Sequence, residues 1–282
     1  GFVIKLNTKV YPTDDVHVRR AIAYATDYKT IQEVIYPGFD MKGPLSDAFK
    51  DAHNDGIEPG VFDLEKAKEA LAKPKYAAHP ITLVNSYVAS LAFEAEVALL
   101  WQAKLEQIGI TLDIKPEPWN RIVELSAKPE TTPASTQVNV SPSYPSPDSM
   151  FYNQYHSKAA GTWWSMEWLQ NPEIDALIDK ARGETDVSAQ NATYKELQTK
   201  IAELQPDVWA VAPNRRYGAN KCLQGYAFIP MQSWDLNFSN FHWDCSAKPC
   251  SPAQPPIPIC RICSPTVWAA RQTKASDPSG RP

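Results

Sequence analysis

The sequence predicts an α/β protein in which helices flank a mixed sheet and a disordered tail follows. Three observations support this fold class. From Gly1 to about Asp244, apolar residues alternate between helical and strand spacing. Between residues 81 and 114, a strand pattern, a helix pattern and a second strand pattern follow one another. After Asp244, Pro, Ser, Ala and Cys dominate without a sustained period up to Pro282, so this stretch is predicted to be disordered.

The first elements are an extended segment over 2–8 and a long helix. Asp14 or Asp15 can cap that helix, because an aspartate carboxylate accepts hydrogen bonds from the free amides of a first turn. Apolar residues then recur at spacings near three and four and are expected to face inward. They are Val18, Ile22, Ala25, Ile31, Val34 and Ile35. Pro37-Gly38 ends the helix, and 39–60 is predicted to be a surface loop.

A strand-helix-strand unit follows. Asp63 is expected to cap a helix over 64–72; after Pro80 come a strand at 81–84, a helix over 91–108 that Gly109 ends, and a strand at 110–114. A connection through a helix favours parallel strands joined by a right-handed crossover. The remaining predicted elements are helices at 119–126, 173–181 and 189–204 and strands at 137–140 and 208–211.

Size and charge exclude some classes of function. The 282 residues, 43% hydrophobic and 21% charged, suffice for one large or two ordinary domains. A formal net charge of -4 supplies no basic field for a nucleic-acid backbone, so we expect no nucleic-acid partner. No apolar run approaches the roughly 20 residues that span a bilayer. The start at Gly1, without Met, predicts a fragment or a mature product whose beginning is missing, so the absence of a signal peptide says little about the compartment.

Catalytic motifs are absent from the sequence. It contains no G-x-S-x-G, G-x-G-x-x-G, P-loop or H-E-x-x-H. The five histidines are scattered singly, and serines without a positioned base are turn and cap residues. We therefore predict that the chain is not an enzyme. A hydrolase-like activity is kept as the third choice, after the two non-enzymatic functions given below.

The cysteines allow two interpretations. Cys245-x4-Cys250 and Cys260-x2-Cys263 are spaced somewhat like a four-thiolate zinc site. Their Pro-rich surroundings offer almost nothing to pack around a metal, so chance spacing is favoured and neither a metal nor a cofactor is expected. Cys222 could instead pair with Cys245 in an oxidising compartment, which spacing alone cannot show.

Several phrases, in their order and spacing, resemble the family-five extracellular solute-binding proteins, the substrate-binding type of peptide and nickel ABC importers. The phrases are LNT at 6–8, DVHVRRAIAYATD at 15–27, DLEKAK at 63–68, LEQIGI at 105–110, PD at 147–148, NPEIDALI at 171–178 and YKELQ at 194–198, with Pro206 after it. Each phrase is weak alone. Together they extend over residues 1 to about 244.

The resemblance implies a periplasmic-binding-protein-like lobe of type II. Residues 1–244 resemble the second lobe plus the return segment, with most of the first lobe missing, and 245–282 would be the tail. The implied function is capture of a peptide-like or other small solute and its delivery to an ABC permease in the membrane. The implied protein is a periplasmic monomer. A truncated, non-binding remnant of such a protein is the alternative.

The candidate ligand-binding residues are Ser143, Tyr144, Asp148, Trp163 and Trp164. Large aromatic residues in loops can form the wall of a solute site, but a core also takes them, and both interpretations stay open for the Trp pair. Asp148 is interpreted first as a loop or helix-cap residue and second as a ligand contact.

The resemblance also indicates what this sequence lacks. In the family's peptide binders, an aspartate at the position of Ser143 receives the ammonium group of the peptide, and an arginine expected near Val88 meets its carboxylate. Neither charge is present, since Tyr87 and Ala89 are not basic either. A sugar, an opine-like conjugate or a longer peptide therefore remains open as the solute.

Overall fold

A computed structural model describes residues 1–72, 80–214, 217–227 and 237–245. These residues divide into two compact units, one made of 1–72 and 80–214 and one made of 217–227 and 237–245. The tail predicted over 245–282 lies outside the described residues, apart from Cys245.

The first unit contains a six-stranded mixed sheet of order β2-β6-β1-β5-β3-β4. The strands are β1 (Phe2–Leu6), β2 (Gly38–Phe39), β3 (Ile81–Val88), β4 (Ile110–Glu117), β5 (Ser135–Asn139) and β6 (Asp207–Pro213). β3 runs parallel to β4 and β5, whereas β1 is antiparallel to its neighbours β5 and β6, and β2 is antiparallel to β6. The predicted mixed sheet is confirmed, and β1 lies in its interior.

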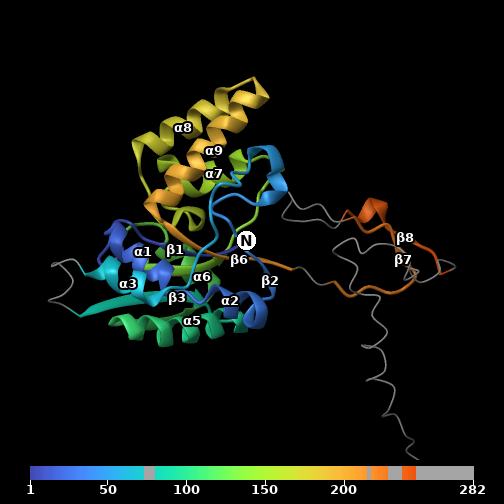
Figure 1. Cartoon of the computed structure of the whole chain (residues 1–282). Coiled ribbons are helices and arrows are strands. Elements are labelled where there is room, and N and C mark those ends of the chain that lie inside the picture. The colour runs from blue at the N-terminus through green and yellow to red at the C-terminus, as the bar shows by residue number, and fades with distance from the viewer. Residues whose placement is uncertain (73–79, 215–216, 228–236, 246–282) are drawn as a thin grey trace, which may run out of the picture. The chain divides into compact units, whose positions relative to one another are not determined.

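Helices cover both faces of this sheet (Figure 1). One face packs on α1 (Val16–Tyr24), α2 (Tyr28–Thr30), α3 (Leu64–Leu71) and α5 (Ala92–Leu105), and the other on α7 (Asp148–Tyr155), α8 (Pro172–Gly183) and α9 (Val187–Leu204). The remaining helical segments are η1 (Ile31–Ile35), η2 (Asp47–Ala52), η3 (Glu106–Ile108), α6 (Trp119–Leu125), η4 (Ser157–Ala159) and η5 (Trp163–Ser165). Within the described ranges, no helix is both long and apolar enough to cross a membrane.

Alternation along the strands produces the two cores. Phe2, Ile4 and Leu6 on β1 point to the face of α1 and α5, where Trp101 is fully buried. Val3 points to the opposite face, toward α7, α8 and α9. Burial on both faces explains why β1 is apolar at nearly every position.

Local signals in the sequence account for the element ends. The Oδ1 atom of Asp15 accepts the His17 amide at 2.8 Å, and that of Asp63 accepts the amides of Glu65 and Lys66 at 3.1 and 3.0 Å. Gly109 adopts φ = +80°, a conformation that suits glycine, between η3 and β4. These caps and the parallel β3-α5-β4 unit confirm the predictions.

Four predictions about the elements and their buried faces are wrong. The helix expected up to Ile35 breaks after Tyr24, because the side chain of Asp27 accepts the Thr30 amide and starts a new turn. Val34, expected to face inward, is 72% exposed. The expected loop over 39–60 contains η2, and the Ser/Pro-rich loop after β5 leads directly into the unpredicted helix α7.

A buried ionic network joins β1, β6 and the α7 side of the sheet. The Nζ atom of Lys5 lies 2.9 Å from the Oε2 atom of Glu167 and 3.7 Å from the Oδ1 atom of Asp207. It also donates to the side-chain oxygen of Gln154 at 3.1 Å, while the Tyr155 hydroxyl donates to the Oδ2 atom of Asp207. The three ionisable side chains are completely buried, so one cation faces two carboxyl groups out of contact with water.

The second unit contains the two-stranded antiparallel pair β7 (Leu223–Gln224) and β8 (His242–Trp243), with η6 (Phe238–Asn240) before β8. A disulfide joins Cys222 to Cys245, with their Cα atoms 4.3 Å apart. The pairing left open by the sequence is therefore the one found in the structure. Cys250, Cys260 and Cys263 lie outside the described residues.

Peptide mapping of the unreduced protein is expected to show one cross-linked pair that contains Cys222 and Cys245. The bond spans 23 residues of sequence and joins segments that β7 and β8 already hold side by side. Mass spectrometry before and after reduction makes the measurement. Recovery of Cys222 linked mainly to Cys250, Cys260 or Cys263 would contradict this pairing.

Candidate ligand-binding site

The carboxyl ends of four strands meet at one edge of the sheet. β3, β4, β5 and β6 share one direction, so their last residues, Val88, Glu117, Asn139 and Pro213, lie along that edge. β4 leads into α6, and β5 leads into the loop 140–147 and then α7. Ligand sites of α/β sheets commonly occupy this edge, and we call it the carboxyl edge.

Three predicted site residues lie in or beside the β5–α7 loop. Ser143 is exposed and Tyr144 is 45% exposed, and the Tyr144 hydroxyl donates to the Oδ2 atom of Asp148. Burial, followed by the hydrogen bond to Asp148, raises the pKa of Tyr144 to about 12. Asp148 is the first residue of α7, but Pro147 occupies the cap position, so the Asp148 side chain is not the helix cap. Its charge still suits the first turn of a helix.

A second helix holds the carboxylate of Asp148. The Nε atom of Arg182, near the end of α8, lies 3.1 Å from the Oδ1 atom of Asp148. The Arg182 guanidinium also lies 4.1 Å from the centre of the Tyr152 ring on α7. Both contacts join α8 to the start of α7 and fix the end of the β5–α7 loop.

The other two predicted residues belong to a cluster of three tryptophans. The Trp163 and Trp164 rings lie 4.4 Å apart in η5, and Trp119 at the start of α6 meets Trp163 edge-on at 5.1 Å. Trp163 and Trp164 are partly buried and pack against the core on the α7 side, whereas Trp119 is 41% exposed. The pair therefore contributes to the core and also has exposed surface.

The resemblance implies an arginine near Val88, at the end of β3. This position carries a buried carboxyl group instead. The backbone amide of Val88 donates to the Oε2 atom of Glu94 at 2.7 Å, and Glu94 is buried. Burial raises the pKa of Glu94 to about 7, although the bond from Val88 opposes the shift. Tyr87 and Val88 present no charge, in agreement with the sequence.

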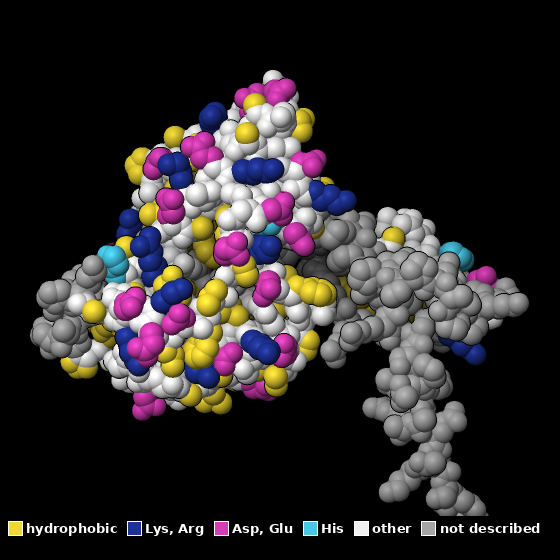
Figure 2. All heavy atoms as spheres, in the orientation of Figure 1, with side chains coloured by type: hydrophobic (Ala, Val, Ile, Leu, Met, Phe, Trp, Pro, Cys, Tyr) yellow, Lys and Arg dark blue, Asp and Glu magenta, His cyan; other side chains and the backbone are white. Residues whose placement is uncertain are grey.

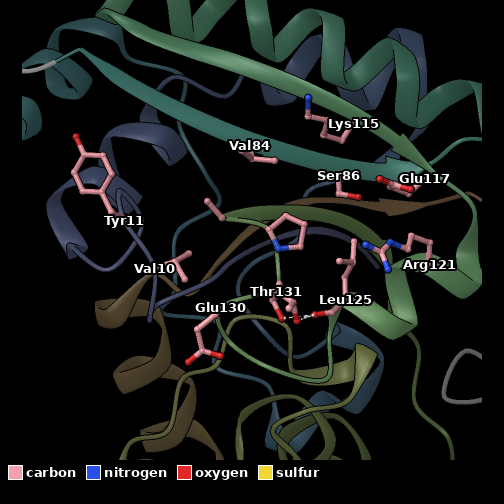
Figure 3. Close-up of a pocket in the computed structure, with 13 residues that line it drawn as sticks. Val10, Tyr11, Val84, Ser86, Lys115, Glu117, Arg121, Leu125, Glu130 and Thr131 are labelled. Atoms are coloured by element: carbon pink, nitrogen blue, oxygen red, sulfur yellow. Dashed lines mark hydrogen bonds between the residues drawn. The ribbon is translucent and has the colours of Figure 1, made fainter.

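A groove of about 400 Å³ lies beside the carboxyl edge, between β3, β4, α6 and the segment before β5 (Figure 3). Val84, Leu125 and Pro133 supply apolar wall, and Arg121 and Glu117 lie at one end, with Tyr11 and Glu130 at the other. This volume lies within the range of small-molecule sites. The groove and the tryptophan cluster share α6, since Arg121 and Leu125 line the groove and Trp119 meets Trp163.

Sequence reasoning missed Trp119, Arg182 and the groove. Trp119 could have been found, because it begins a helix directly after a strand of the parallel unit, where ligand contacts concentrate. Arg182 could not, since 34 positions separate it from Asp148 and no local pattern links them.

The surface in Figure 2 has Lys and Arg interspersed with Asp and Glu, with no field of one sign.

Comparisons with known proteins agree with this architecture. Residues 1–162 match the model of the bacterial extracellular solute-binding proteins, family 5 Middle. The chain is 21% identical over 239 residues to the probable D,D-dipeptide-binding periplasmic protein DdpA of Escherichia coli, which covers 83% of this chain and 45% of that protein. It is 28% identical over 211 residues to the heme-binding protein A of Haemophilus influenzae, covering 72% of this chain and 37% of that protein.

A solved structure shows the same fold. The periplasmic binding protein DppA from Helicobacter pylori, in complex with the peptide STSA, superposes with a TM-score of 0.75 at 22% identity and covers 86% of this chain and 47% of that one. The chain thus spans about half the length, or less, of these relatives. Because the family model matches more than half of the chain, this protein belongs to the bacterial extracellular solute-binding proteins of family 5.

Proposed function

We propose that this chain forms one wall of the solute site in the substrate-binding component of an ABC importer. The observation that carries the proposal is the cluster of Trp119, Trp163 and Trp164 at the carboxyl edge, where β4 leads into α6. Solute sites combine aromatic walls with a few directed polar groups, and Ser143 and Tyr144 supply such groups here. Binding rather than catalysis is the proposed role, with no cofactor.

The relatives guide the proposed solute and partners. One is a probable D,D-dipeptide-binding protein, one is a heme-binding protein and one was solved with the peptide STSA. We propose a peptide-like or other small solute, a periplasmic monomer and delivery to a membrane permease. Residues 1–244 would form the second lobe and return segment, and 245–282 a separate tail.

Binding by the isolated chain is expected to be weak. One wall supplies about half of the contacts, while most of the translational and rotational cost of binding remains. Each tenfold loss of affinity needs only about 1.4 kcal/mol. Fusion of the first lobe of the Helicobacter pylori DppA ahead of Gly1 is expected to recover at least about a hundredfold in affinity by this arithmetic. Calorimetric titration with STSA, a disaccharide and heme makes the measurement.

The tryptophans can be tested in the same fusion. Trp163→Ala together with Trp164→Ala should abolish the recovered binding and leave the circular dichroism spectrum unchanged. Trp243→Ala is the matched control, because Trp243 is 65% exposed and lies in the second unit. Submicromolar binding by the isolated chain would refute the one-wall proposal. Unchanged binding in the double variant would assign the Trp pair to the core alone.

A further inference from the structure

The candidate residues of this wall include one carboxylate, that of Asp148, and it is already paired, whereas Glu117 at the end of β4 lines the neighbouring groove. Among Trp119, Ser143, Tyr144, Asp148 and the Trp163–Trp164 pair, only Asp148 has a carboxyl group. Its Oδ1 atom is buried 3.1 Å from the Nε atom of Arg182, and its Oδ2 atom accepts the Tyr144 hydroxyl. Oδ1 is therefore closed to an ammonium group of a solute, and Oδ2 already has one donor.

Arg182 is itself fixed in this position. Its guanidinium packs 4.1 Å from the Tyr152 ring, and only 15% of the Asp148 side chain is exposed. Release of Asp148 for a ligand would break this ion pair, and the Arg182 side chain, which is 42% exposed, would then be solvated by water. On α6, the exposed side chains of Arg121 and Glu124 pair with each other at 2.8 Å.

The exposed parts of this wall are rings and uncharged polar groups. Tyr144 is 45% exposed and Trp119 is 41% exposed. Aromatic faces attract both rings and cations. A cation–π contact at an exposed ring raises the affinity by about two- to fivefold. Desolvation of an unpaired ammonium lowers the affinity by several powers of ten, so the cost exceeds the gain. The uncharged ring is therefore the better occupant.

From this arrangement we infer that the wall receives an uncharged, ring-bearing part of the solute and discriminates against an ammonium group, with Arg182 setting this specificity by masking Asp148. The inference rests on the proposed function, since it concerns the same site. It identifies the solute by its chemistry: a ring with hydroxyl or amide groups rather than a free amino terminus at this wall.

Three probes with the same aromatic ring and different charge distinguish an uncharged solute group from an ammonium or a carboxylate. Benzyl alcohol, benzylammonium and benzoate can be titrated into the full chain while the indole N–H signals of Trp119 and Trp163 are followed by NMR, with Trp243 as the internal reference. Benzyl alcohol should cause saturable shifts with an affinity at least about tenfold higher than either ion. Equal or tighter binding of benzylammonium would overturn the inference but leave the site standing. Absence of shifts with all three probes would overturn both.

Replacement of Arg182, which removes the ion pair with Asp148, provides a second test. Arg182→Met keeps an unbranched side chain against Tyr152 and frees Asp148, so benzylammonium should bind about tenfold more tightly while benzyl alcohol is unaffected. Arg182→Lys keeps a cation and should show no gain. Asp148→Asn added to Arg182→Met should remove the gain, and a gain that survives would overturn the role of Asp148. Arg182→Gln serves the same purpose if the Met variant does not fold.

Discussion

At a pH above about 8, where Glu167 is ionised, replacement of Lys5 by Met is expected to lower the free energy of unfolding by about 3–5 kcal/mol, the usual cost of removing one partner from a buried ion pair. The substitution leaves Glu167 and Asp207 facing each other in a site with no exposed surface. Burial opposes the charge of Lys5, but the two carboxylates outweigh this effect and raise the pKa of Lys5. Urea denaturation followed by tryptophan fluorescence measures the loss.

Lys68→Met is the matched control for that experiment. Lys68 also lies 2.8 Å from a carboxylate, that of Glu65, but about half of its side chain is exposed. Exposed pairs contribute about 0–1 kcal/mol, so this variant should be nearly as stable as the parent. A loss below about 1 kcal/mol for Lys5→Met would show that the two carboxyl groups adapt by taking up protons at little cost.

Stability is expected to fall as the pH rises from about 5 to 8, through the titration of Glu167. Burial raises the pKa of Glu167 to about 8, although the charge of Lys5 opposes the shift. The unfolded chain releases this proton near its ordinary pKa of about 4.3. Between these values the folded protein holds a proton that the unfolded one has lost, so each rise in pH favours unfolding, by at most about 1.4 kcal/mol per unit.

Glu167→Gln tests this directly, because the amide stays uncharged at every pH. The parent and the variant should converge as the pH falls below about 4.3, where both states of the parent are protonated, and the variant should be the more stable one at pH 8. Glu65→Gln, at an exposed position, is the control and should follow the parent. A difference between parent and Glu167→Gln that does not change with pH would contradict the raised pKa.

Local signals in the sequence predicted most elements, and tertiary contacts account for the exceptions. The β3-α5-β4 unit was readable because its period changes at Gly109 and at Pro80. The break after Tyr24 was not, since the helical spacing of apolar residues continues across it. Asp27 is held there by the Nζ atom of Lys104 at 3.1 Å, a contact that spans 77 positions. Hydrogen bonding and this pair lower the pKa of Asp27 despite its partial burial.

The candidate site was predictable to a similar degree. Loop aromatics and a proline-aspartate pair pointed to the β5–α7 loop and to η5. They did not show that Asp148 is paired with Arg182, because the geometry depends on how α8 packs against α7. The charge state of the site is thus a property of the fold rather than of the loop.

The position of β1 inside the sheet has a consequence for synthesis. β1 is among the first described residues to leave the ribosome, yet it pairs with β5 on one side and β6 on the other. At about 5–20 residues per second, the ~200 residues between β1 and β6 take about 10–40 s to appear. During that interval the apolar strand has an unpaired edge, which is the kind of surface that aggregates. Completion of the first unit therefore waits for residues 207–213, and a nascent chain that stalls before them should need a chaperone to stay in solution.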